Sequence, residues 1–182
     1  MGIPTLIKTV TSSNAATTSF VDGTSSVVLD GTYDEYMFVM TNYNSATDTA
    51  NLLFNGSADT GSNYNVTKTT TFWEARHTEG GTSSFGYIAS QDLAQSTDFQ
   101  MLAYSTGNAA DECVSGILHL FAPANTTYVK HFYWRGVQLR SDETCMDEFI
   151  AGYFNTTSAV DAIQFKSSTG NHDSIIQLYG IA

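Results

Sequence analysis

Four histidines are the residues best suited to bind a transition metal. His119 lies in the segment GILHLF and His131 in YVKHFYW, and neither has another His, Cys or carboxylate two or four residues away. His77 and His172 lie near Glu79 and Asp173, at the expected ends of strands or in loops. A zinc site would need ligands from distant segments, so we expect structural histidines and no bound metal or other cofactor.

Aspartates could bind calcium in two segments. Asp30, Asp34 and Glu35 lie in DGTYDEY, and Asp59 lies in SADTGSN. Neither segment has the alternating Asp ligands and closing Glu of a calcium-binding loop, so we expect aspartates that stabilise turns. A third acidic group, over 142–148, is expected to be a solvated loop.

Glycoside hydrolysis is the enzymatic chemistry that this sequence could most readily support. It needs two carboxyl groups that face each other across a groove, one of them with a raised pKa. Glu74 beside Trp73 is the one candidate acid, and the sequence does not identify its partner. No nucleophile, phosphate-binding or dinucleotide-binding motif occurs either. We therefore expect no catalytic residue and no enzyme activity.

The charge and hydropathy of the chain exclude several partners. Its 182 residues include only 14% charged residues and carry a formal net charge of -11, with seven Lys and Arg in total. Nucleic acid is a poor partner, because binding to phosphates needs many cations. The chain has no apolar run long enough to cross a membrane, so no membrane insertion is expected.

The start of the chain, MGIPTLIKTVTSS, lacks the apolar stretch of a signal peptide, which predicts synthesis in the cytoplasm. In that compartment Cys113 and Cys145 are expected to be buried free thiols rather than a disulfide.

Alternation of apolar and polar residues predicts ten to twelve strands and no helix. Thirteen segments are candidates for these ten to twelve strands: 5–10, 19–22, 26–29, 33–43, 49–54, 64–77, 83–90, 98–104, 113–121, 127–137, 147–154, 160–166 and 174–181. Segments 160–166 and 174–181 are expected to form a hairpin, and so are segments 49–54 and 64–77. Segment 33–43 and the three strands within 113–154 are expected to be central. This pattern predicts one all-β domain over 1–182, a jelly-roll-like antiparallel β-sandwich, with 1–14 as an extended N-terminal arm.

Aromatic residues gather in the strand that follows residue 127. Tyr128, His131, Phe132, Tyr133 and Trp134 alternate between the two faces of this strand. Half of them can fill a core, and the other half would then face a groove or a neighbouring subunit.

Several segments resemble small structural proteins of tailed bacteriophages that infect marine bacteria. They are TLIKTVT, YDEYMFVMTNY, SGILHLFAPANTTYVKHFYWRG, AGYFNTTSAVDAIQFKSSTGN and IQLYGI, and the resemblance spans nearly the whole chain. It implies a virion component that folds as a β-sandwich and forms homo-oligomers, with a trimer as one candidate. The implied location is the capsid surface or the tail, and no catalytic residues come with it.

The absence of long-fibre repeats favours a capsid decoration or cement protein, which binds the major capsid protein, other virion proteins and its own copies. The residues that we expect at these interfaces are Ile3, Leu6, Ile7 and Val10 in the arm, and Tyr128, Tyr133 and Trp134. The alternative is a tail or fibre-knob protein that binds a host-surface receptor or glycan through exposed aromatic residues and the loops 55–63 and 107–111.

Overall fold

The computed structural model describes residues 2–182, which form twelve strands and no helix. The strands build two antiparallel sheets packed as a β-sandwich, so the predicted fold class is confirmed. The strand bounds are β1 Thr5–Ala15, β2 Thr17–Val21, β3 Glu35–Ser45, β4 Ala50–Ser57, β5 Lys68–Thr78, β6 Ser83–Tyr87, β7 Gln100–Thr106, β8 Val114–Phe121, β9 Lys130–Leu139, β10 Thr144–Phe154, β11 Ala162–Ser167 and β12 His172–Ile181. The described part of the chain contains no helix long and apolar enough to cross a membrane.

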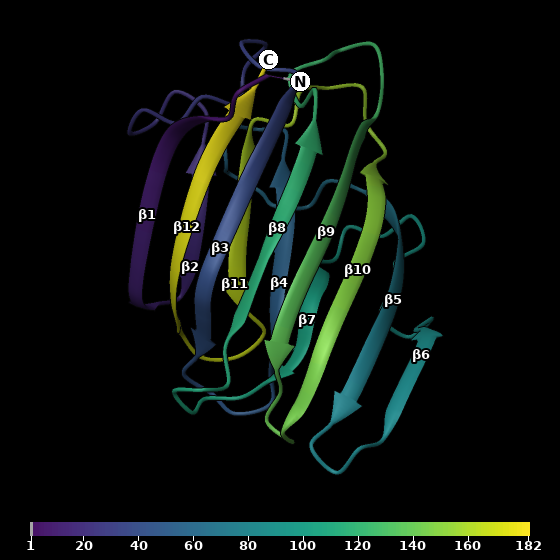
Figure 1. Cartoon of the computed structure of the whole chain (residues 1–182). Helices are drawn as coiled ribbons and strands as arrows, with labels where there is room; N and C mark the ends of the chain where they lie inside the picture. The colour runs from purple at the N-terminus through teal and green to yellow at the C-terminus, as the bar shows by residue number, and fades with distance from the viewer. Residues whose placement is uncertain (1) are drawn as a thin grey trace.

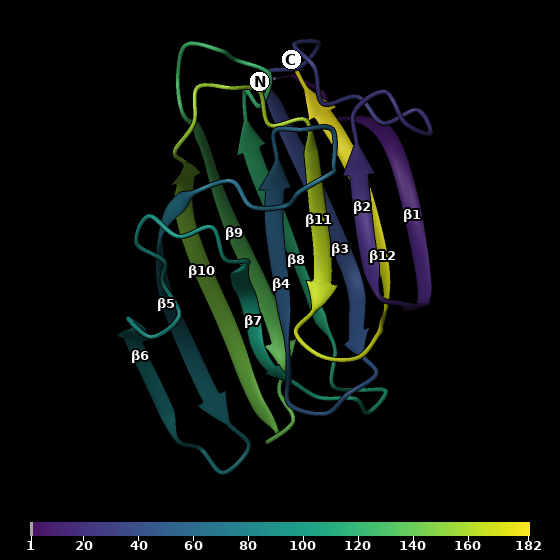
Figure 2. The same ribbon diagram turned by 180° about the vertical axis from the view of Figure 1, so that it is seen from behind.

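The two sheets are unequal in size. The larger has the strand order β1-β12-β3-β8-β9-β10-β5-β6 and faces the viewer in Figure 1. The smaller has the order β2-β11-β4-β7 and lies behind it, in front in Figure 2. At one side β5 and β6 extend beyond the smaller sheet (Figure 2).

Strict alternation along the central strands explains why they form a two-layer structure. In β9 and β12, buried positions alternate with exposed or half-buried positions over nearly the whole strand. Because successive side chains of a strand point to opposite faces, one face of each strand fills the space between the sheets. The prediction that 33–43 and the strands within 113–154 are central is also confirmed, since β3, β8, β9 and β10 are interior strands of the larger sheet.

The core between the sheets is rich in aromatic rings that meet edge to face. Phe38 from the larger sheet contacts Phe20 and Phe165 of the smaller one, with ring centroids 5.3 and 5.6 Å apart. Phe54 of β4 contacts Phe132 of β9 at 5.0 Å. Such pairs add to the free energy gained from burial, and they fix how the two sheets pack.

Two glycines make room for the largest core side chain. Gly116 and Gly136 are cross-strand partners on β8 and β9, and a Cβ atom on either would lie 2.5 Å from the indole of Trp134. The indole therefore occupies the space that two side chains would otherwise fill.

Both predicted hairpins are wrong, because the chain crosses between the sheets at those points. β11 pairs with β2 and β4 in the smaller sheet, whereas β12 pairs with β1 and β3 in the larger. In the same way β4 belongs to the smaller sheet and β5 to the larger. The strand predicted over 26–29 is absent as well, since these residues form a turn and an irregular segment.

The segment expected as an N-terminal arm is a strand from Thr5 onward. β1 pairs with β12 and forms one edge of the larger sheet. The two cysteines are free, as expected, but the prediction that both are buried is wrong: Cys113 is half-buried and Cys145 is exposed.

Candidate functional site

The face of the larger sheet that points away from the smaller sheet, here called the outer face, carries side chains from every second position of each strand. The strand register aligns them in rows that run across the sheet. One row contains Val39, Ile117, Arg135, Phe149, Trp73 and Tyr87, from β3, β8, β9, β10, β5 and β6 in turn. A second row contains Ser115, Val137, Asp147, Ala75 and Phe85, from β8, β9, β10, β5 and β6 in turn.

Stacked rings form the centre of the first row. The rings of Trp73 and Phe149 are nearly parallel, with centroids 4.0 Å apart. The guanidinium of Arg135 lies 4.8 Å from the Phe149 ring centre on the other side, and the Phe85 ring meets Trp73 edge-on at 5.2 Å. Arg135 is also held by Asp147, which accepts two hydrogen bonds from it at 2.9 and 3.3 Å. The packing fixes these side chains before any partner binds.

Much of this face is apolar and uncovered. Phe85 is 72% exposed, Tyr87 55%, Val137 49% and Tyr133 41%. Contiguous apolar surface of this kind on a protein usually marks a binding site.

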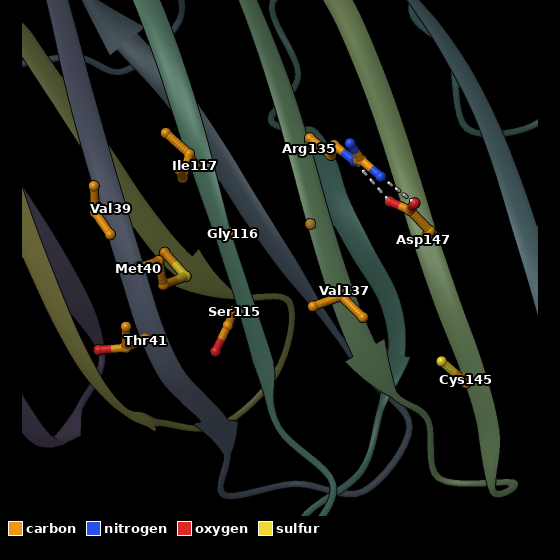
Figure 3. Close-up of a pocket in the computed structure, with 11 residues that line it drawn as sticks. Val39, Met40, Thr41, Ser115, Gly116, Ile117, Arg135, Val137, Cys145 and Asp147 are labelled. Atoms are coloured by element: carbon orange, nitrogen blue, oxygen red, sulfur yellow. Dashed lines mark hydrogen bonds and ion pairs between the residues drawn. The ribbon is translucent and has the colours of Figure 1, made fainter.

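The outer face has an apolar hollow of about 670 Å³ between β3 and β10. The small side chains of Ser115 and Thr41 line it, as does the Arg135–Asp147 ion pair (Figure 3). Cys145 lies on β10 beside it (Figure 3).

A second hollow of about 420 Å³ lies at the other end of the outer face, between β5 and β8. Phe121, His131, Tyr133 and Tyr153 contribute to its walls. The His119 ring stacks on Tyr133 at 4.4 Å.

The partner carboxyl group that the hydrolase hypothesis requires for Glu74 is Glu148, its cross-strand neighbour on β10. Both point into the sandwich and are buried, at 2% and 0% exposure. Tyr104 of β7 donates a 2.8 Å hydrogen bond to Glu74, and Gln138 donates one of 2.6 Å to Glu148. Burial raises the pKa of Glu148 well above its usual value.

Glu148 has the raised pKa that a general acid needs, but neither acid of the pair faces a hollow identified in residues 2–182. β7 covers the pair. The geometry therefore favours a structural role for Glu74 and Glu148.

The structure does not bring the histidines together. His119 is hydrogen-bonded to Glu35 at the outer face, where His131 also lies. His172 is buried, bonds Thr18 and stacks on Tyr43. Residues 2–182 contain no group of three or more His, Cys, Asp or Glu side chains that could hold a metal ion.

Of the candidate calcium ligands, Asp59 and Asp30 stabilise turns, whereas Glu35 lies in β3 and contacts His119. Asp59 accepts hydrogen bonds from Ser57 and from the backbone and side chain of Asn63, and these bonds lower its pKa to about 2. Asp30 accepts one from the backbone of Thr32.

The acidic run over 142–148 is divided by the alternation of β10. Asp147 pairs with Arg135 on the outer face, whereas Glu148 is buried on the inner one. Asp142, which precedes β10, pairs with Arg140.

The predicted interface residues lie in three different environments. Ile3, Leu6, Tyr128 and Tyr133 are exposed, Ile7 and Val10 pack partly against the core, and Trp134 is buried. Trp134 and Tyr133 point to opposite faces of β9. The side chain of Trp134 is only 1% exposed, so the prediction that it lies at an interface is wrong. The sequence did not identify the Trp73–Phe149 stack, since the two residues are adjacent only through the register of β5 and β10.

Of the predicted glycan-binding loops, 55–63 is anchored to neighbouring segments by hydrogen bonds. The Asn55 side chain is fully buried and donates hydrogen bonds to the backbone oxygens of Tyr64 and Thr97. Residues 108–111 are exposed.

In comparisons with known proteins, no family model, no curated protein sequence and no solved structure matches the chain.

Proposed function

We propose that this chain is a structural protein of a bacteriophage virion, a capsid decoration protein that binds its neighbours through the outer face of its larger sheet. The observation that carries the proposal is the apolar, ring-stacked and uncovered surface across β3, β8, β9, β10, β5 and β6. The resemblance of five segments to phage structural proteins supports the virion as its location.

An antiparallel sheet suits this role because its backbone is already ordered. A preformed surface loses little conformational entropy on binding, so more of the contact energy remains as affinity. Repeated over many copies on a particle, modest interfaces hold together through multivalency.

Electron cryo-microscopy of the intact particle tests the proposal. We expect density for this β-sandwich over the capsomers, at the symmetry of the capsid. A particle that lacks the protein would overturn the virion assignment.

Density at the tail alone would favour the alternative, a tail or fibre-knob protein that binds a host-surface glycan. The observation in its favour is the exposed edge of the aromatic ridge, Phe85 and Tyr87 on β6, since sugars stack on aromatic rings. Binding of the purified protein to host surface glycans, lost in Tyr87→Ala, would support this alternative.

A further inference from the structure

The outer face combines a ridge and a hollow that lie on the same rows. Phe85 and Tyr87 are exposed on β6 at one edge of the sheet, and residues of β8 and β9 line the hollow of about 670 Å³. In the second row the strand register connects the two directly: Ser115 of the hollow is followed across the sheet by Val137, Asp147, Ala75 and finally Phe85.

We propose that a second copy of this chain covers the outer face, in a dimer whose two-fold axis runs along β10. This inference deepens the proposed function, because it names the partner of the outer face. A two-fold interface uses the same patch on both subunits, so the patch must be complementary to itself. The outer face meets this requirement, because the ridge lies on one side of β10 and the hollow on the other. A two-fold rotation about β10 places each ridge opposite the hollow of the partner subunit.

The register specifies which residues meet. β8 lies two strands from β10 on one side, and β6 lies two strands from it on the other. A two-fold axis along β10 therefore sets β8 of one protomer opposite β6 of its partner. Phe85 of the partner subunit then faces Ser115 in the hollow, and Tyr87 of the partner subunit faces Ile117. Arg135, one strand from the axis, faces Trp73 of the partner subunit, a favourable cation–π pair.

Charge allows this contact in spite of the net charge of -11. Leaving histidines aside, the outward positions of β8, β9, β10, β5 and β6 carry two charged side chains, Arg135 and Asp147, and these pair with each other. The axis along β10 also brings Asp147 near Asp147 of the partner subunit, and the ion pair that each Asp147 makes with Arg135 of its own chain offsets this repulsion. The remaining negative charge lies elsewhere on the molecule, where salt screens it over about 10 Å.

The area is also adequate. Five strands about 4.8 Å apart and up to about ten residues long cover on the order of 700 Å². A stable interface buries about 800 Å² of each partner. The five strands therefore supply nearly all the area that a stable dimer needs.

The exposed thiol of Cys145 gives a direct test. It lies on β10, beside the proposed axis, so in the dimer it is close to Cys145 of the partner subunit. The experiment uses the full chain with Cys113→Ser, a short bis-maleimide cross-linker and sedimentation to measure mass. We expect a dimer that cross-links through Cys145, and no cross-link when Cys145→Ser is added.

Phe85→Ser in the same background should weaken the dimer by roughly tenfold or more, because it removes the ridge that fills the hollow. Ile175→Ser is the matched control, since Ile175 is also an exposed apolar residue, at 38%, but lies on β12, outside these five strands. It should leave the dimer unchanged.

Three results would overturn the proposal. The first is a protein that stays monomeric at high concentration, whether or not it binds glycans, and the second is a trimer. The third is a dimer that does not cross-link through Cys145 and is not weakened by Phe85→Ser. These outcomes are independent of where the protein lies on the particle. A monomer that nevertheless decorates capsids would therefore refute the dimer alone.

Discussion

The two faces of the larger sheet have similar apolar content but different surroundings. On β9, Trp134 and Phe132 point inward and are buried against the smaller sheet, whereas Tyr133 and Val137 point outward and remain exposed. The inner face fills one core, and the outer face has apolar side chains beyond what that core uses. The difference indicates that the first face stabilises the fold and that the second is available for binding.

Core and surface should respond very differently to loss of a ring, and this is the largest expected effect. Trp134→Ala should lower the free energy of unfolding by about 3–5 kcal/mol, because it leaves a cavity in the core. Tyr133→Ala, one residue away on the outer face, should cost less than about 1 kcal/mol in the monomer. Denaturant unfolding of both variants at low protein concentration measures the difference, and equal losses would contradict the assignment of the two faces.

Overpacking the inner face should also destabilise the fold. Gly136→Ala places a Cβ atom 2.5 Å from the Trp134 ring and should cost about 1–3 kcal/mol. The control is Gly86→Ala on β6, where no atom lies within 4 Å of the added Cβ. Unfolding midpoints should separate the two variants, and a neutral Gly136→Ala would show that the tryptophan has room to move.

The inner face is not apolar throughout, and its buried acid predicts a pH dependence. Burial raises the pKa of Glu148 in the folded state, so between its unfolded value of about 4.3 and that raised value the folded state binds more protons than the unfolded state. Stability from this group is therefore present at low pH and falls as pH rises through that window.

Glu148→Gln should remove this decline in stability with pH. The free energy of unfolding of the variant should be close to that of the native protein near pH 4 and higher than it near pH 8. Thermal unfolding across this range measures the effect, with Glu79→Gln at an exposed site as the control. If the two variants follow the same pH profile, Glu148 is not the group responsible.

The smallest effect on folding is expected at the ion pair of the outer face. Arg135 and Asp147 are 64% and 33% exposed, and surface ion pairs contribute about 0–1 kcal/mol. Arg135→Ala should therefore change the unfolding midpoint only slightly while weakening self-association. A loss of more than about 2 kcal/mol in folding stability would place this residue among those that hold the fold together.

Alternation in the sequence was sufficient to predict the all-β sandwich and its central strands, because the period of two in segments such as 130–139 reports directly which side chains are buried. Assignment of strands to sheets could not be predicted in the same way. The sequence does not show whether a turn joins neighbours within one sheet or crosses to the other, which is why the hairpin expected over 160–181 is divided between two sheets.

The candidate site depended on register even more strongly. Glu74 was recognised as an acid, but its partner Glu148 lies 74 residues later and meets it only through the pairing of β5 with β10. The stack of Trp73 on Phe149 arises from the same pairing.

The most direct test of the central claim is an electron cryo-microscopy map of the particle detailed enough to orient the sandwich. We predict that the outer face of the larger sheet lies against another protein chain, with Phe85, Tyr87 and Val137 buried in the contact. A map in which that face points to solvent, while the smaller sheet makes all the contacts, would contradict the account.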